Sequence, residues 1–93
     1  MNYQKTFYYL DGKTKRFVVE YYPDGKLNKA TWFHKDGKTI NCIIEYNPKT
    51  GKKTKYTKYN PDGTVFNEIY YNPNGSIKTT KKILIIHKKT YPK

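Results

Sequence analysis

A short phrase that ends in glycine recurs six times along the chain, at intervals of 12 to 14 residues. It begins with an aromatic residue, and Pro, Asp or Asn usually precedes the glycine. Regular punctuation of this kind predicts a repeat protein, because turn residues rarely fall so evenly by chance. The phrases are YYLDGK (8–13), YYPDGK (21–26), FHKDGK (33–38), YNPKTGK (46–52), YNPDGT (59–64) and YNPNGS (71–76). They contain every glycine of the chain: Gly12, Gly25, Gly37, Gly51, Gly63 and Gly75.

Each phrase has the composition of a tight turn between two β-strands. Pro presets φ, Asp or Asn follows, and Gly takes the left-handed position that closes a hairpin. The segments between turns are about eight residues long and rich in β-branched and aromatic residues, which favours strands of about 26 Å. The sequence therefore predicts an all-β fold, an antiparallel, single-layer, twisted meander of about seven strands with positive φ at the turn glycines.

A longer period runs through the short one. Two residues before the aromatic of each turn, Thr alternates with an aliphatic residue, at Thr6, Val19, Thr31, Ile44, Thr57 and Ile69. This predicts a single domain (1–93) of three hairpin repeats of about 25 residues, at about 4–28, 29–53 and 54–78, and a closing strand at 79–91. The apolar run 83–86 is expected to close the sheet or to pair with a second chain, because a bare apolar edge strand aggregates.

The alternation of inward and outward residues slips after two of the turns, those of Gly12 and Gly37. Pairs of apolar residues follow each slip, Val18–Val19 and Ile43–Ile44. A one-residue slip moves side chains to the other face of a sheet. We therefore expect a β-bulge or a changed turn type near these doublets.

Composition limits the range of functions. The net charge is +12, carried almost entirely by Lys, while Ala and Arg occur once each. Such a bias is typical of an AT-rich genome and weakens the charge as a functional signal. Cys42 is the only cysteine, so an internal disulfide is excluded and a half-buried strand thiol is expected. We expect no signal peptide in this chain, and it has no apolar run of about 20 residues that could span a membrane. The chain is therefore expected to be soluble, or to be a mature form whose leader has been removed.

Catalytic and metal-binding patterns are missing from the sequence. All four Asp lie in turns, and we expect Glu20, Glu45 and Glu68 to face cross-strand Lys. The two His, His34 and His87, form no Cys/His group at zinc-ligand spacing. We therefore predict a non-enzymatic protein with no metal and no cofactor.

The aromatic residues offer the first candidate site, for a protein partner. The rings that open the six phrases share one position relative to their turns, and they form two rows at opposite ends of the meander. By parity, Trp32, Phe7 and Tyr70 fall on the face opposite to these rings. A sheet without helices leaves at least one face exposed or in an interface. The predicted partner-binding residues are Trp32, Tyr21, Tyr46, Tyr71, Tyr8, Phe33 and Tyr59.

Lysines interleaved with tyrosine offer a second candidate, a polyanion such as nucleic acid. The segments 49–58 and 78–89 carry five Lys each and no acidic residue. Such patterns hold phosphates and stack on bases, although the scarcity of Arg argues against this alternative. Its candidate residues are Lys49, Lys52, Lys53, Lys55, Lys58, Lys81 and Lys82.

The segment IIEYNPKTGKKTKYTKYNPDGT (43–64) resembles a short-repeat family of unknown function found in phytoplasma proteins. The match is best over 36–76 and does not reach 77–93. YYPDGKL (21–27) is more distantly similar to MORN-like and YwqK-type β-hairpin repeats, which are mostly interaction scaffolds. These resemblances imply a repeat protein that is secreted into a host and binds a host protein. They supply no activity and no functional residues.

Overall fold

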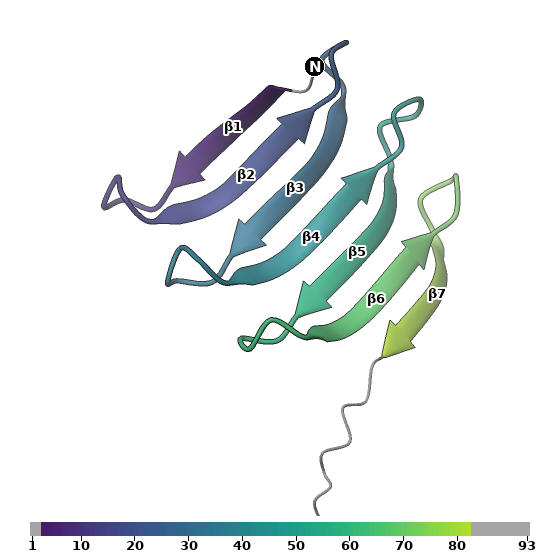
Figure 1. Cartoon of the computed structure of the whole chain (residues 1–93). Helices are drawn as coiled ribbons and strands as arrows, with labels where there is room; N and C mark the ends of the chain where they lie inside the picture. Colours follow the sequence, from purple (N-terminus) through teal and green to yellow (C-terminus); the bar gives the residue numbers. More distant parts are fainter. Residues whose placement is uncertain (1–2, 83–93) are drawn as a thin grey trace, which may run out of the picture.

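The computed structural model describes residues 3–82 as seven antiparallel strands in one sheet. Strands that follow one another in sequence are neighbours in space, in the order β1-β2-β3-β4-β5-β6-β7 (Figure 1). The described part contains no helix, so no membrane-spanning helix is found in it. The strands are β1 (Tyr3–Tyr8), β2 (Lys15–Tyr21), β3 (Leu27–Phe33), β4 (Ile40–Tyr46), β5 (Lys53–Tyr59), β6 (Val65–Tyr71) and β7 (Ile77–Lys82). The predicted all-β meander is confirmed.

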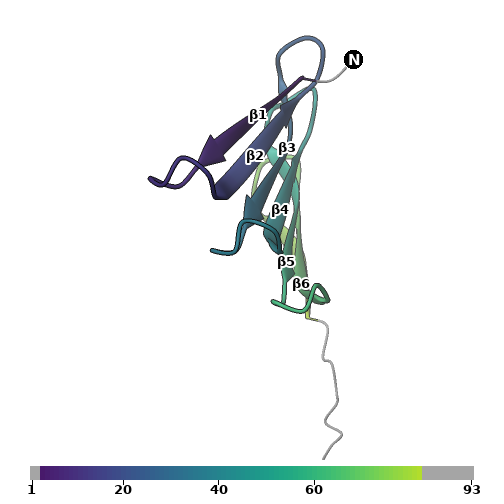
Figure 2. The ribbon, with the colours of Figure 1, turned by 60° about the vertical axis from the view of Figure 1, so that its left-hand side comes forward.

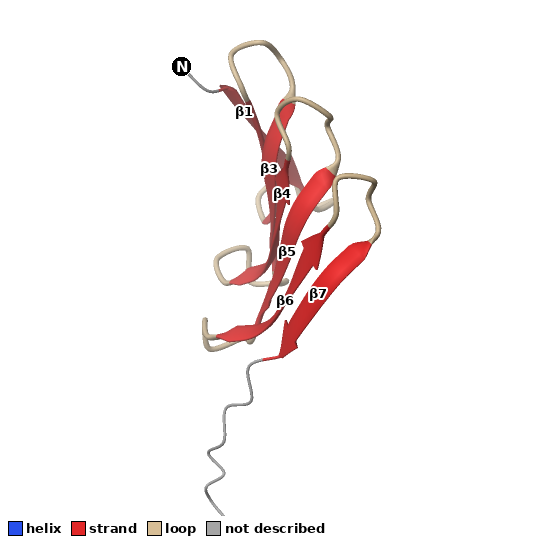
Figure 3. Cartoon of the chain, turned by 90° about the vertical axis from the view of Figure 1, so that its right-hand side faces the viewer, coloured by secondary structure: helices blue, strands red, loops and turns tan. Residues whose placement is uncertain are grey.

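The sheet is a single twisted layer. Viewed toward its edges, it has no described element on either face (Figures 2 and 3). Burial is correspondingly low: among the described side chains only Ala30, 7% exposed, and Thr57, 4% exposed, are buried. Most side chains of the central strands are half-buried, because each is covered only by its neighbours on the same face.

The turns have the predicted geometry. All six glycines have positive φ, between 69° and 94°. In five of the six turns the glycine N–H donates to the carbonyl three residues earlier, as Gly63 does to Asn60 at 2.9 Å. The side chain of Asp or Asn stiffens the loop, since Asp24 Oδ1 accepts a hydrogen bond from Lys26 N at 2.9 Å. Turns at one end of the sheet join odd to even strands, and turns at the other end join even to odd strands (Figure 1).

Turn length explains the slips in alternation. The loop that contains Gly12 closes between Tyr9 N and Thr14 O, and is one residue longer than the loop from Tyr22 N to Lys26 O. The loop of Gly37 is longer in the same way, and in both the added Thr follows the glycine. This residue moves the next strand out of phase, so the predicted change of turn type is confirmed.

A β-bulge lies near each doublet, as predicted, because Arg16 and Asn41 are left without a cross-strand partner. The doublets Val18–Val19 and Ile43–Ile44 themselves pair without interruption. The register shifts once in every hairpin, beside the turn. For example, Phe7 pairs with Phe17 but Tyr8 pairs with Lys15, which leaves one extra residue in β2. A bulge raises the local twist, so the six bulges at alternating ends add to the intrinsic twist of the sheet.

The predicted closing strand is described only as far as Lys82, in β7. The apolar run 83–86 and the proposed pairing through it lie outside the described residues.

Candidate functional site

Cross-strand pairing assigns the strand residues to two faces, because directly paired side chains point to the same side of a sheet. We call the first the aromatic face. It consists of Tyr3, Lys5, Phe7, Phe17, Val19, Tyr21, Leu27, Ala30, Trp32, Cys42, Ile44, Tyr46, Lys53, Tyr56, Lys58, Asn67, Ile69, Tyr71, Ile77, Thr80 and Lys82.

The second is the ion-pair face, named for its charged residues. It consists of Gln4, Thr6, Tyr8, Lys15, Val18, Glu20, Lys29, Thr31, Phe33, Ile40, Ile43, Glu45, Lys55, Thr57, Tyr59, Val65, Glu68, Tyr70, Thr79 and Lys81.

The two predicted rows of rings lie on opposite faces, which corrects the common face that the sequence had indicated. The row of β2, β4 and β6 (Tyr21, Tyr46, Tyr71) is on the aromatic face, together with Trp32. The row of β1, β3 and β5 (Tyr8, Phe33, Tyr59) is on the ion-pair face. Each of these strands ends at its ring, and odd and even strands run in opposite directions. The extra residue of each bulge changes the face to which the following residues point, so the two rows of rings end on different faces. The partner-binding candidates are therefore two groups rather than one.

Three stacked rings dominate one end of the aromatic face. Phe7 of β1 stacks on Phe17 of β2, with centroids 4.5 Å apart and planes at 15°. Phe17 stacks in turn on Trp32 of β3, at 4.3 Å and 26°. Sequence reasoning did not select Phe17, although the register beside the first turn would have placed it between the other two rings. A stack of this kind forms a rigid apolar platform, since each ring is fixed by its neighbour.

The stack continues into an apolar centre. The next row across the face is Val19, Ala30, Ile44, Tyr56 and Ile69. Beside Trp32 lies the free thiol of Cys42, which is half-buried as expected. Burial raises the pKa of this thiol, while the hydroxyl of Tyr56 and the charge of Lys58 act weakly in the opposite direction. The raised pKa disfavours the thiolate, which is the nucleophilic form of cysteine.

Charge is distributed unequally between the faces. Within residues 3–82 all three strand glutamates lie on the ion-pair face, and the aromatic face has no carboxylate. The aromatic face does carry cations, at Lys5, Lys53, Lys58 and Lys82. An apolar surface with cations and no acid has the electrostatic character to meet an acidic partner.

On the ion-pair face, by contrast, glutamates and lysines lie side by side. Glu20, Lys29, Glu45 and Lys55 follow one another across β2 to β5. Lys29 Nζ lies 3.8 Å from Glu20 Oε2, and Lys55 Nζ lies 3.6 Å from Glu68 Oε2. Burial lowers the pKa of Lys55, but the Glu68 carboxylate, with smaller effects from Tyr70 and Glu45, outweighs burial and raises it. The predicted pairing of strand Glu with cross-strand Lys is confirmed for these two pairs.

The lysines predicted to hold a polyanion do not gather in one patch. Lys49, Lys52 and Lys53 lie at the turn between β4 and β5. Lys55 and Lys81 lie on the ion-pair face, and Lys58 and Lys82 on the aromatic face. Lys58 also donates a hydrogen bond to Asn41 Oδ1.

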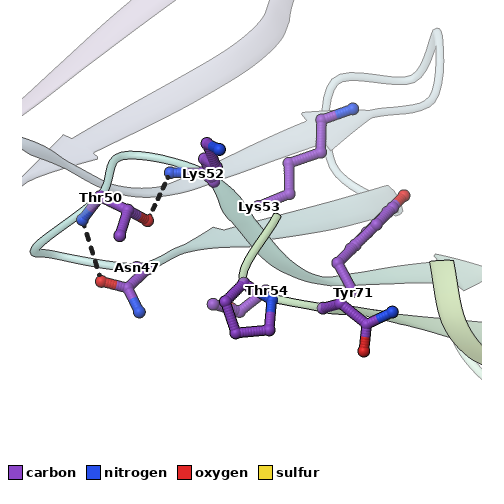
Figure 4. A pocket seen from close by; sticks show the side chains of 8 residues that line it. Asn47, Thr50, Lys52, Lys53, Thr54 and Tyr71 are labelled. Atoms are coloured by element: carbon purple, nitrogen blue, oxygen red, sulfur yellow. Dashed lines mark hydrogen bonds between the residues drawn. The ribbon is translucent and has the colours of Figure 1, made fainter. Parts of the chain in front are cut away.

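A small cleft lies at the even-to-odd end of the aromatic face, away from the ring stack, between the β4–β5 and β6–β7 turns (Figure 4). Its volume is about 80 Å³, and it opens onto a shallower depression of about 420 Å³ beside Tyr46. Lys53 and Tyr71 extend from the neighbouring strands β5 and β6 to the same side, with Lys53 Nζ 5.9 Å from the Tyr71 ring centroid. The cleft is lined by Asn47, Thr50, Lys52, Lys53, Thr54, Tyr71, Asn72 and Pro73.

The described part holds no cluster of the side chains that metal binding requires. No group of three His, Cys, Asp or Glu gathers among residues 3–82. Turn carboxylates serve their loops: Asp36 accepts hydrogen bonds from the backbone N–H of Lys38 and Thr39 and from the Thr39 hydroxyl. The hydroxyl of Thr39, followed by the two N–H groups, lowers the pKa of Asp36 to about 2.

Comparison with known proteins agrees with an all-β repeat. A family model described as a protein of unknown function (DUF2963) matches residues 8–58 and again 33–84. No curated protein matches significantly. The two overlapping family matches span nearly all of the described strands.

Two solved structures contain a similar sheet. One is a chain in the crystal structure of the GtfA/B complex bound to UDP and GlcNAc, with TM-score 0.57, 20% identity and 73% of this chain covered. The other is in the structure of accessory secretory proteins 1, 2 and 3 of Streptococcus pneumoniae, with TM-score 0.62, 16% identity and 88% covered. The present chain covers only 16% and 17% of those chains, and the likeness shows the fold alone.

Proposed function

We propose that this chain, which belongs to the DUF2963 family of proteins of unknown function, is a non-enzymatic module that binds a protein partner on its aromatic face. The observation that carries the proposal is the Phe7–Phe17–Trp32 stack on a face that no described element covers. Large aromatic residues in contact with apolar neighbours are the groups that dominate protein interfaces.

The energetics favour this face over the other. A charge that is already paired must lose water and its ion pair when a partner covers it, and this cost offsets much of the gain. The aromatic face loses mainly apolar surface, at about 25 cal/mol per Å² of area removed from water. Its rings are also held by stacking before the partner arrives, which lowers the entropy lost on binding.

The ion pairs and turn carboxylates support the non-enzymatic part of the proposal. Glu20 and Glu68 are each within reach of a lysine, and Asp11 and Asp36 hold their own loops. A general acid or base needs a carboxyl group that is available to a substrate.

The resemblance to phytoplasma repeat proteins supports a secreted, effector-like protein whose partner belongs to the host. The similar chains in solved structures carry this sheet as about one sixth of a longer protein, which supports its use as a module.

The alternative is binding of a polyanion, favoured by the cations of the aromatic face. The two proposals differ in salt dependence. A polyanion complex weakens steeply between about 50 and 200 mM salt because counterions are released. An apolar protein interface changes little over that range. Purification on the immobilised full chain at both salt concentrations separates the two kinds of partner.

A matched pair of variants tests the proposed face. Trp32 and Phe33 are consecutive in β3 and lie on opposite faces. With a captured protein as analyte in surface plasmon resonance, Trp32→Ala should weaken binding at least about tenfold, mainly through faster dissociation. Phe33→Ala should leave the affinity within about twofold. Lys52→Glu with Lys53→Glu should mainly slow association. Loss of binding with Phe33→Ala alone would overturn the proposal.

A further inference from the structure

The cleft between the β4–β5 and β6–β7 turns presents hydrogen-bond donors and no acidic group. The side chains of Lys52 and Lys53 are exposed, and no ion pair is formed by either within residues 3–82. Lys29 and Lys55, on the other face, do have carboxylate partners. An ammonium group without an acidic partner is ready to receive an anion.

The asparagine of the cleft adds a donor. Asn47 Oδ1 accepts hydrogen bonds from Lys49 N at 2.7 Å and Thr50 N at 3.1 Å, of which the second is drawn in Figure 4. These bonds fix the amide and leave its Nδ2 group to donate elsewhere. Thr50 Oγ1 in turn accepts from Lys52 N at 3.2 Å, which ties the lysine-bearing end of the turn to the same loop.

The position of Lys53 is particular to one hairpin. Lys53 pairs with Tyr46 at the first residue of β5. The corresponding residues of the other even-to-odd hairpins are Leu27, paired with Tyr21, and Ile77, paired with Tyr71. A row that is otherwise aliphatic and aromatic therefore carries a single cation, beside the Tyr71 ring.

We propose that this cleft binds the carboxylate of an Asp or Glu side chain of a protein partner whose apolar residues lie on the aromatic face. The inference rests on the proposed function and adds the chemistry of the partner. The cleft volume of about 80 Å³ suits one small group such as a carboxylate. A nucleic acid needs a line of cations, whereas the other predicted lysines are divided between the two faces.

A peptide library tests the proposal on the full chain. Neighbouring strands are about 4.8 Å apart, so an extended peptide of about ten residues crosses the sheet. The probe is a soluble library of such peptides built from Tyr, Val, Ser and Gly, with one scanned position that is Glu, Gln or Lys. The immobilised proteins are the natural sequence, Lys53→Leu, Lys26→Gln and Trp32→Ala. Lys53→Leu introduces the residue that the β2–β3 hairpin has at the corresponding position, Leu27, and Lys26→Gln removes an exposed lysine from the turn of that hairpin.

The natural chain should enrich Glu over Gln about fivefold, the effect of one partly exposed ion pair. Lys53→Leu should abolish this preference while still capturing peptides, and Lys26→Gln should keep it. Equal recovery of Glu and Gln peptides by the natural chain, or an unchanged preference in Lys53→Leu, overturns the inference. If capture still depends on Trp32 in that case, the proposed function survives. If capture never depends on Trp32, the proposed function fails as well. Binding of an oligothymidine through Lys53 without a Glu preference assigns the cleft to a polyanion and also overturns the inference.

Discussion

Trp32 stacks on Phe17 across β2 and β3, with the ring centroids 4.3 Å apart. Neither ring is fully buried, because a single-layer sheet offers each side chain neighbours only on its own face. Much of what fixes these rings is therefore their contact with one another. The pair stabilises the fold and also forms the surface proposed to meet the partner.

A double-mutant cycle measures this contact. Phe17→Leu and Trp32→Leu keep an apolar side chain but remove the stacking, and we expect a coupling free energy of about 1 kcal/mol. Urea denaturation of the two single variants and the double variant gives the value. Ile69 lies in β6, three strands away from Trp32 in β3, so Ile69→Val with Trp32→Leu is the control cycle and should be nearly additive. Additivity of the Phe17 and Trp32 changes would show that the stack contributes no specific stability.

Two glycines with the same role differ in their surroundings. Gly37 and Gly63 both have positive φ, at 69° and 92°. A Cβ at Gly37 would lie 2.8 Å from Thr14 Cγ2 in the neighbouring odd-to-even turn, while a Cβ at Gly63 meets nothing within 4 Å. Gly63→Ala should therefore lower the free energy of unfolding by about 1–2 kcal/mol, from backbone strain alone.

Gly37→Ala should lower the free energy of unfolding more than Gly63→Ala does, because the turns that contain Gly37 and Thr14 must also move apart. The difference should shrink in a background that carries Thr14→Ser, which removes the methyl group at Cγ2. Thermal unfolding followed by circular dichroism measures the two glycine variants with and without Thr14→Ser. Equal losses for Gly37→Ala and Gly63→Ala would show that the contact between the two turns is unimportant.

The pKa of Asp36 gives the fold a definite response to acid. It is about 2 in the folded chain, against an ordinary value of 3.8, because the Thr39 hydroxyl and two N–H groups donate to the carboxylate. A lowered pKa means that the folded state binds fewer protons than the unfolded state. Its contribution to stability is thus present above about pH 4 and is lost as the pH falls toward 2.

Asp36→Asn should flatten this part of the stability profile, and Thr39→Val should move the Asp36 pKa upward. Carboxyl resonances followed by NMR during an acid titration report the pKa directly. A folded-state pKa near 3.8 would contradict the hydrogen-bond arrangement described for this turn.

The repeat made most of the fold predictable. Turn residues at fixed intervals gave the number of strands and the meander, and the phase change after Gly12 and Gly37 revealed longer turns. Bulges do lie near the doublets Val18–Val19 and Ile43–Ile44, but the sequence did not show that every hairpin has one, because each bulge follows from hairpin geometry beside the turn rather than from the doublets.

The candidate site was only partly predictable, since a face is defined by register. A single shifted residue in each hairpin separates Tyr8 from Tyr21, although both open the same phrase. The same shifts bring Phe17 next to Trp32 and gather the glutamates on the other face. Sequence spacing gives the period of such features, but not the side of the sheet to which each points.

The most direct test of the binding face uses the single tryptophan of the chain. With fluorotryptophan at Trp32 and an unlabelled captured partner, fluorine NMR reports from the aromatic face alone. The resonance should shift or broaden as the partner is added, and it should do so equally in the Phe33→Ala variant, whose missing ring lies on the ion-pair face. A Trp32 resonance that stays unchanged at a partner concentration that saturates binding would contradict the assignment of this face.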